Sequence, residues 1–163
     1  MRARLGVPLV FVMSTLLAGL IGMPTATGQT VLHLVLPADT QKVQTIDQYG
    51  DGLRLGDRIA ARGRLTDGDG TEVGTAYGDC VVHRHIKGPE TGLWNCTYVL
   101  ELGDGDLIVQ GLDPRGPGVY EMAVLGGAGA YAHASGEATF TDTGVETDMV
   151  EQTDMVIRLS KKR

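Results

Sequence analysis

The sequence predicts an all-β fold, either a sandwich or a barrel, and three observations lead to this prediction. Short apolar runs alternate with turn residues from Gln29 onward, at spacings typical of β-strands. Little helical periodicity is present. Glycine accounts for 24 of the 163 residues, and many of these glycines lie in turns between the runs. A sandwich and a closed barrel both fit this pattern.

Composition limits the classes of function. Hydrophobic residues make up 42% of the chain, enough for one domain with a sizeable core. The net charge of −6 argues against a nucleic-acid partner, because phosphates would be repelled.

Residues 1–28 have the pattern of a secretory signal peptide. Arg2 and Arg4 give a positive start, residues 7–23 are nearly all apolar or small, and small residues precede Gln29. Pro24 interrupts the apolar run, which favours cleavage over a retained membrane anchor. We therefore expect a mature chain of about 135 residues. This chain, 29–163, would be a single domain, secreted or exported, with no membrane contact after cleavage and no barrel element upstream of Gln29.

Eight segments have the composition of strands. In order they are Val31–Leu36, Arg58–Leu65, Val73–Ile86, Leu93–Leu102, Asp106–Leu112, Val119–Leu125, Glu137–Asp142 and Met155–Leu159. The polar connection 37–56 is longer than most connections in compact domains, so we expect a functional or mobile loop there.

The third and fourth predicted strands form the longest hairpin. If its centre is near Gly88, residues whose numbers sum to 176 face each other, so Cys80 opposes Cys96 and Gly78 opposes Tyr98. This register brings the two cysteines within bridging distance. In an exported chain it predicts a Cys80–Cys96 disulfide.

Two sets of residues invite a metal interpretation. His83 and His85 share one strand face, but zinc needs three or four ligands and no further cluster is apparent. Several aspartates lie in glycine-rich segments, where turn chemistry explains them better than calcium binding does. These are Asp67, Asp69, Asp104, Asp106 and Asp113. We predict no metal site and no cofactor.

Three segments resemble the allene oxide cyclase and dirigent protein families. Residues 121–136 start as Glu-Met-Ala-Val-Leu-Gly-Gly-Ala-Gly-Ala-Tyr and are similar to the glycine-rich corner of both families, where another backbone can approach closely. Residues 78–82 resemble the glycine-x-cysteine-valine strand of the cyclases, and residues 108–111 resemble their valine-glutamine-glycine strand. The resemblance covers about residues 57–159 and implies an eight-stranded antiparallel β-barrel, lipocalin-like in shape.

The resemblance carries over only part of the cyclases' site. Cys80 matches their active-site cysteine, which lies inside the barrel. Their catalytic glutamate falls at Leu34 or a neighbour, their water-holding asparagine at Gly63 and their pocket tyrosine near Asp113. The plant activity on an allene oxide is therefore not expected, and Cys80 in a disulfide has no thiol to offer.

Arg84, Trp94 and Tyr98 are the candidate catalytic residues. Arg84 lies on the otherwise apolar face near the hairpin end, where it either reaches solvent from the barrel rim or polarises a ligand carbonyl. Trp94 and Tyr98 either pack in the core or wall a cavity, with one hydrogen-bond donor each. The expected substrate-binding residues are Val82, Trp94, Tyr98, Leu100, Met122 and Tyr131.

The family is also similar to small bacterial barrels that fold a polyketide chain for a [4+2] cyclisation. Such chemistry needs an apolar cavity that holds the reacting groups together rather than an acid–base pair. The resemblance thus implies a cyclase, a pericyclase-like isomerase, that folds a linear hydrophobic, polyketide-like substrate for intramolecular cyclisation. The alternative is a non-catalytic exported barrel that binds an apolar small molecule or acts as a dirigent-type template. Assembly into a homo-oligomer, a dimer or a trimer, stays open.

Overall fold

The computed structural model describes residues 23–24, 29–48, 50, 54–85, 92–114, 116–147 and 150–160, without the side chains at 23–24, 84–85, 145–147 and 150. Within this part of the chain, the elements in order are β1 (Met23–Pro24), β2 (Thr30–Leu36), the 3-10 helix η1 (Ala38–Thr40), β3 (Lys42–Ile46), β4 (Arg58–Thr66), β5 (Glu72–His85), β6 (Gly92–Leu102), β7 (Gly105–Asp113), β8 (Gly118–Gly127), the 3-10 helix η2 (Gly129–Tyr131), β9 (Gly136–Thr147) and β10 (Val150–Leu159). No helix among these residues has the length and apolar character needed to cross a membrane.

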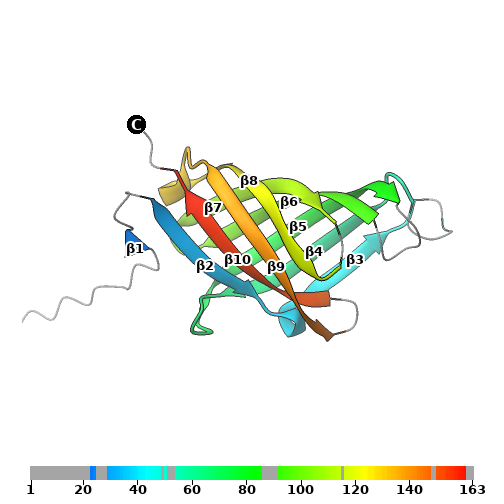
Figure 1. Ribbon diagram of the computed structural model, residues 1–163, viewed down its shortest axis with the longest axis horizontal. Coiled ribbons are helices and arrows are strands. Elements are labelled where there is room, and N and C mark those ends of the chain that lie inside the picture. The colour runs from blue at the N-terminus through cyan, green and yellow to red at the C-terminus, as the bar shows by residue number, and fades with distance from the viewer. Residues whose placement is uncertain are drawn as a thin grey trace, which may run out of the picture.

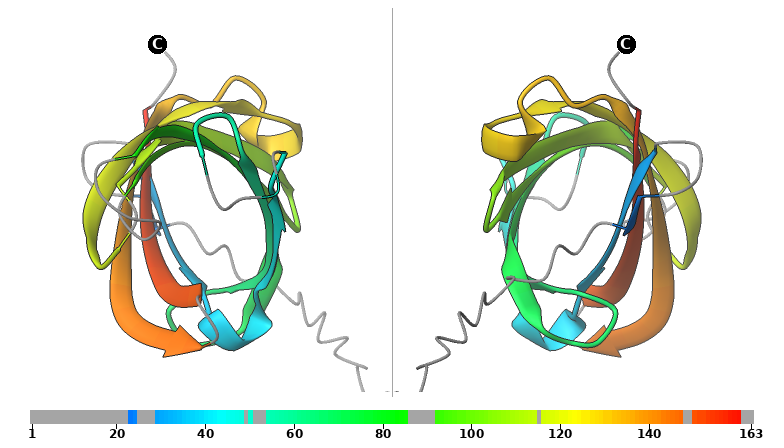
Figure 2. Two further views of the ribbon diagram at one scale, coloured as in Figure 1. Left: turned by 90° about the vertical axis from the view of Figure 1, so that its right-hand side faces the viewer. Right: turned by 90° about the vertical axis from the view of Figure 1, so that its left-hand side faces the viewer.

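Eight of the strands form a closed antiparallel barrel (Figures 1 and 2). Hydrogen-bonded neighbours follow the order β2-β10-β9-β8-β7-β6-β5-β4, and the pair Val35–Thr66 joins β4 back to β2. Closure leaves these eight strands with no long open edge, which is the advantage of a barrel over an open sheet. The predicted eight-stranded antiparallel barrel is confirmed, and the sandwich is excluded.

Two further strands depart from the sequence prediction. β3 pairs with β4 from Lys42–Arg62 to Ile46–Arg58, so the segment expected to be a loop contains regular structure. All five residues of β3 are exposed, so it lacks the buried face that would identify a strand. β1 pairs with the start of β2, which corrects the expectation of no barrel element before residue 29. Residues 1–22 and 25–28 lie outside the described residues, and cleavage of the leader stays a prediction.

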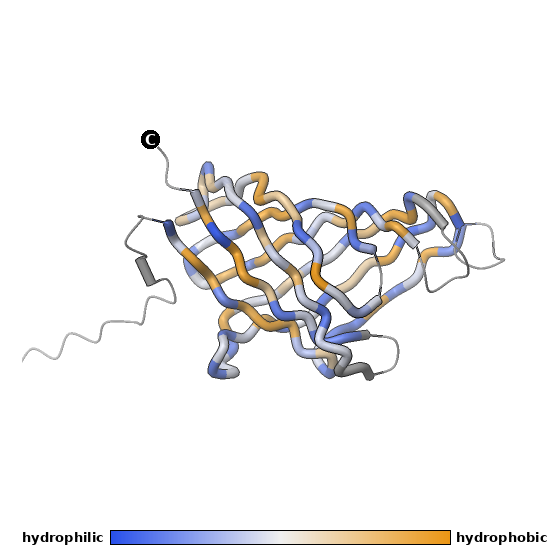
Figure 3. The backbone as a smooth tube through the Cα atoms, viewed as in Figure 1, coloured by the Kyte–Doolittle hydropathy of each residue, from blue (hydrophilic) through white to orange (hydrophobic). Residues whose placement is uncertain are grey.

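Hydrophobic and hydrophilic residues alternate along much of the barrel strands (Figure 3), and the buried apolar side chains form one core. Burying one such side chain contributes about 1.5–3 kcal/mol. The buried residues of this core include Leu32, Leu34, Leu36, Ile59, Leu65, Ala76, Cys80, Val82, Trp94, Cys96, Leu100, Leu107, Val109, Met122, Val124, Ala138, Phe140, Met155, Ile157 and Leu159.

Glycines on the inner face make room for large side chains on the neighbouring strand. A Cβ atom at Gly78 would lie 2.7 Å from Cε1 of Tyr98, and one at Gly111 would lie 2.7 Å from Cγ of Met122. Real Cβ atoms do not approach other atoms so closely, so any larger residue would displace its neighbour. The pairing of small with large residues gives the interior its close packing.

The glycine corner predicted in residues 121–136 lies where the end of β8 meets the start of β7. The backbone N–H of Ala128 donates to the carbonyl oxygen of Asp106 at 2.9 Å, and that of Ala130 donates to Asp104 at 2.9 Å. Gly129 has a φ of +59°, and a Cβ there would lie 2.6 Å from the Asp104 carbonyl oxygen. The predicted close approach of two backbones is therefore confirmed, and only glycine allows it.

Candidate functional site

One end of the barrel, called the mouth, brings polar groups to the inner face. It is formed by the end of β5, the start of β6 and the end of β7. Cys80, Trp94, Cys96 and Asp113 are all buried there. Trp94 and Asp113 are direct cross-strand neighbours, so both side chains lie on the inner side of the sheet.

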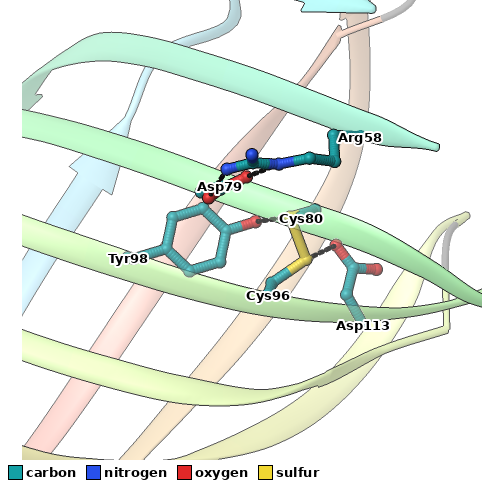
Figure 4. Close-up of a disulfide and its surroundings, with 6 residues drawn as sticks. All are labelled: Arg58, Asp79, Cys80, Cys96, Tyr98 and Asp113. Carbon is teal, nitrogen blue, oxygen red and sulfur yellow. Dashed lines mark hydrogen bonds and ion pairs between the residues drawn. A yellow bond between two sulfur atoms is a disulfide. The ribbon is translucent and has the colours of Figure 1, made fainter. Parts of the chain in front are cut away.

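The predicted Cys80–Cys96 disulfide is present on the inner wall near the mouth (Figure 4). The two residues pair directly across β5 and β6, with their Cα atoms 4.0 Å apart. Gly78 opposes Tyr98, as the hairpin register predicted. Cys80 thus lies inside the barrel but holds no free thiol, so thiol chemistry is excluded while the bond is intact.

Two oxygen atoms flank the disulfide, one on each sulfur (Figure 4). The Tyr98 hydroxyl oxygen lies 3.8 Å from the sulfur of Cys80, and an Asp113 carboxylate oxygen lies 3.9 Å from that of Cys96. A disulfide sulfur carries no hydrogen, so the Tyr98 hydroxyl is the donor in its weak contact. The disulfide therefore forms a platform between a hydrogen-bond donor and a carboxylate.

Three aromatic rings cross the interior below the mouth, and we call them the aromatic layer. Phe140 on β9 lies between Tyr98 on β6 and Tyr120 on β8, with centroid distances of 5.5 Å and 5.3 Å. The Tyr120 and Phe140 rings are stacked at an interplanar angle of 15°, and those of Tyr98 and Phe140 are tilted at 32°. Such contacts fix ring positions beyond what burial alone would do. The ring contacts therefore join β6, β8 and β9 inside the barrel.

The predicted substrate-binding residues do not all gather in one place. Val82 and Trp94 pair near the mouth. Met122 pairs with Gly111, which in turn pairs with Cys96 of the disulfide. Leu100 is fully buried farther along β6, toward the opposite end.

Tyr131 belongs to η2, which lies against the start of β7, at the end of the barrel opposite the mouth. Burial and a hydrogen bond to Asp104 raise the pKa of Tyr131 to about 12. Tyr131 therefore helps to close the packed end of the barrel rather than to line the mouth.

The prediction that Arg84 lies on the inner face requires that inner and outer residues alternate without interruption along β5. This alternation is interrupted just before Arg84. Val82 pairs with Trp94 as predicted, but the register then shifts by one residue and Arg84 pairs with Leu93. Such a bulge cannot be seen in the sequence because it depends on the pairing of two strands. The Arg84 side chain lies outside what the structure describes, and its role stays a prediction.

Sequence reasoning missed Asp113 and the aromatic partners of Tyr98. The sequence pattern predicts a turn at Asp113, but this residue is the last of β7 and only 6% exposed. Extending the alternation of Leu107 and Val109 to residue 113 would have placed it inside. Phe140 contacts Tyr98 through barrel closure, for which a sequence carries no local signal.

Polar residues around this end also hold the structure in place. Asp57 is fully buried, and its carboxylate accepts hydrogen bonds from the backbone N–H groups of Gln48 at 3.0 Å and Arg54 at 2.6 Å. Arg58 and Asp79 form an ion pair on the outer face, and the Asp79 carboxylate raises the pKa of Arg58 (Figure 4). Asp57 therefore anchors a loop segment that precedes β4.

Two open hollows lie elsewhere on the described surface. One, of about 370 Å³, includes Arg158 and Ser135, and the other, of about 330 Å³, includes Arg62 and Tyr77. Neither contains Trp94 or Tyr98. Among the described residues, no three His, Cys, Asp or Glu side chains are arranged to hold a metal ion.

Comparison with known proteins agrees with this architecture. The model of the allene oxide cyclase barrel like domain matches residues 38–157. A search of curated proteins found no match.

Solved structures with the same fold have several activities. Pyocyanin demethylase has a TM-score of 0.65 and 25% identity, covering 80% of this chain and 99% of that protein. The pterocarpan synthase dirigent protein PsPTS1 has a TM-score of 0.66 and 20% identity, covering 83% and 96%. The Diels-Alderase AbmU from Streptomyces koyangensis has a TM-score of 0.62 and 19% identity, covering 83% and 66%. At these last two identities the likeness establishes the fold alone.

Proposed function

Because this chain belongs to the allene oxide cyclase barrel-like family, we propose that it is a cyclase that acts on a linear hydrophobic, polyketide-like substrate. The substrate binds at the mouth and is folded for an intramolecular cyclisation, with a [4+2] cycloaddition as the reaction to test first. The Diels-Alderase with this barrel gives a precedent for the reaction class on the fold.

The aromatic layer is the observation that carries this proposal. Tyr98, Phe140 and Tyr120 present contacting rings beneath the mouth, with one pair stacked and the other tilted. A group of contacting rings suits an extended polyene, whose π-system packs against aromatic rings. The mouth is thus the part of the interior that suits an unsaturated chain.

The proposed catalysis is mainly positional. Holding diene and dienophile in a near-attack pose replaces an entropically costly encounter with a pre-arranged one. The Tyr98 hydroxyl near the disulfide, and the Arg84 guanidinium as the second candidate donor, would polarise a carbonyl of the substrate. Trp94, next to Asp113 on the inner wall, would confine the chain on its other side.

Single-turnover kinetics with a linear polyene precursor that carries diene and dienophile test the proposal. Trp94→Ala should slow conversion about thirty-fold, which corresponds to about 2 kcal/mol of transition-state binding. Tyr98→Phe removes only a hydroxyl, and Tyr77→Phe is its matched control, because Tyr77 lies on the outer wall and is 40% exposed. Arg84→Met tests the second donor. Circular dichroism checks that each variant is folded.

Three outcomes separate cyclase from carrier. Conversion by wild type and the Tyr77 variant, with losses in the Trp94 and Tyr98 variants, supports the proposal. Folded Trp94 and Tyr98 variants that match wild type would contradict this site. Stoichiometric binding of the precursor without acceleration over buffer would favour the carrier or dirigent-type template.

A second candidate function is demethylation of pyocyanin. It follows from the 25% identity with pyocyanin demethylase, in a match that covers 99% of that protein. The buried Asp113 and the aromatic layer also suit a compact aromatic ligand. Incubation with pyocyanin, followed by mass spectrometry, tests this candidate. Loss of a methyl group from pyocyanin, abolished in the Trp94 variant, would support a demethylase over a cyclase.

A further inference from the structure

The outer wall of the barrel carries a second group of side chains, far from the inner face. β3, β4 and β5 are neighbours in the sheet (Figure 1), where Lys42 pairs with Arg62 and Arg62 pairs with Tyr77. Direct cross-strand neighbours project to the same side. Lys42, Arg62 and Tyr77 therefore form one row, which we call the outer-wall row, and all three residues are exposed.

Two like charges lie directly opposite each other in this row. Lys42 and Arg62 are cross-strand neighbours, an arrangement that destabilises a sheet unless something compensates. Within the described part of the chain, no ion pair joins either of them to a carboxylate. The chain as a whole has a net charge of −6, so this local excess of positive charge is not a consequence of composition.

The other arginines on the outer face of β4 each form an ion pair. Arg58 pairs with Asp79, and Arg64 lies 3.4 Å from Glu72. These are also the carboxylates nearest to the outer-wall row on β5, and each is already engaged. Arg62 is thus the arginine between two ion pairs that has no ion pair of its own among the described residues.

Tyr77 holds Arg62 in a position suited to binding. The guanidinium carbon of Arg62 lies 5.5 Å from the centroid of the Tyr77 ring. A contact over a ring occupies a face of the planar guanidinium, whereas its N–H donors lie at the edge. A pre-ordered arginine loses less conformational entropy when it binds a phosphate or carboxylate in a bidentate manner.

A hollow of about 330 Å³ lies at this row. Lys42, Gln44, Arg62 and Tyr77 line it together with Ala60 and Ala61. Ala60, exposed on the same face of β4 as Arg62, gives the hollow an apolar part beside the two cations. The hollow therefore combines a site for one negative group with a surface for an apolar body.

We propose that the outer-wall row binds a small amphipathic anion, in which a phosphate or carboxylate group is attached to an aromatic or other apolar body. The anionic group bridges Lys42 and Arg62 and relieves their repulsion. The apolar body covers Ala60 and the edge of the Tyr77 ring. This site is separate from the mouth and does not depend on the reaction proposed there.

Amide chemical shifts of the full domain, titrated with phenyl phosphate, test the proposal. The expected result is saturable binding with shifts in residues 42–44 and 60–62. Arg62→Gln should weaken binding about tenfold or more, and Lys42→Gln should weaken it severalfold. Arg64→Gln is the matched control, because it removes the same charge from the same face of β4. All three side chains are exposed, so the variants are expected to fold.

Inorganic phosphate and benzyl alcohol separate the two parts of the ligand, and both should bind more weakly than phenyl phosphate. Equal binding of inorganic phosphate would overturn the requirement for an apolar body, and equal binding of benzyl alcohol would overturn the requirement for a charge. Absence of saturable binding, shifts confined to the mouth, or an Arg64 variant as weak as the Arg62 variant would each overturn the site.

Discussion

Removing the Cys80–Cys96 disulfide should lower the free energy of unfolding by about 3 kcal/mol, because closing a loop of this length restricts the unfolded chain. The two cysteines are 16 residues apart. The folded state should change little, since β5 and β6 pair over the whole register around the disulfide. The cross-link therefore acts mainly on the unfolded chain.

Guanidinium unfolding of wild type and of Cys80→Ala/Cys96→Ala, each in oxidising and reducing buffer, separates two contributions. In oxidising buffer the proteins differ by the cross-link and by the packing of the sulfur atoms. In reducing buffer they differ by packing alone, which should cost about 1 kcal/mol or less per small cavity. Free energies rather than midpoints must be compared, because a cross-link also makes the unfolded state more compact.

Two results would refute this reasoning. Mass spectrometry must first show that the bond is intact in the oxidising buffer and broken in the reducing buffer. If the free energy of unfolding of wild type is then the same in both buffers, the entropic argument is refuted. Two free thiols in the intact mass under non-reducing conditions would refute the disulfide itself.

Three further predictions follow from buried groups. Gly78→Ala should cost about 1–3 kcal/mol because its Cβ would lie 2.7 Å from the Tyr98 ring, and an unchanged near-ultraviolet circular dichroism spectrum would contradict it. Asp57→Ala should cost about 2 kcal/mol because two backbone N–H groups lose their buried acceptor, and their hydrogen exchange should accelerate. Tyr131 has its pKa raised to about 12 by burial and by Asp104, so its contribution to stability is complete below about pH 10 and is lost as pH rises through about 12. Ultraviolet titration of Tyr131→Phe should lack one tyrosine ionisation near pH 12 that wild type shows.

The fold followed from the sequence because alternation and turn glycines are local signals. The β5–β6 register was predictable for the same reason: one turn fixes it, and the cysteine pair checks it independently. β3 was missed because its alternation is not accompanied by burial. Closure, here the single bridge Val35–Thr66, came only from the family resemblance, since no local pattern distinguishes a barrel from a sandwich.

The candidate site was predictable only in part, because a site depends on contacts between distant strands. Trp94 and Tyr98 were placed correctly on the inner face by alternation alone. Arg84 was placed on the inner face on the assumption that the alternation continues past Val82. The register shifts by one residue there, and such a shift exchanges the two faces of a strand. The ring contacts of Phe140 join β9 to β6 and β8, and they appear only when the sheet is closed.

The distribution of small residues explains why the mouth, rather than the whole barrel, is the proposed site. An eight-stranded barrel has an interior that side chains can just fill or that can hold one small ligand. Here Gly63, whose added Cβ would lie 2.6 Å from Leu36, and Gly78 give up their own volume to a larger neighbour. Those glycines thus serve packing and do not create space for a ligand. A ligand cannot replace the aliphatic core without unfolding it. The substrate of the proposed reaction is therefore expected on the mouth side of the aromatic layer, where Trp94, Asp113 and the disulfide form the wall. Variants at Leu100 or Leu107 should accordingly change stability far more than ligand preference, whereas variants at Phe140 should change both.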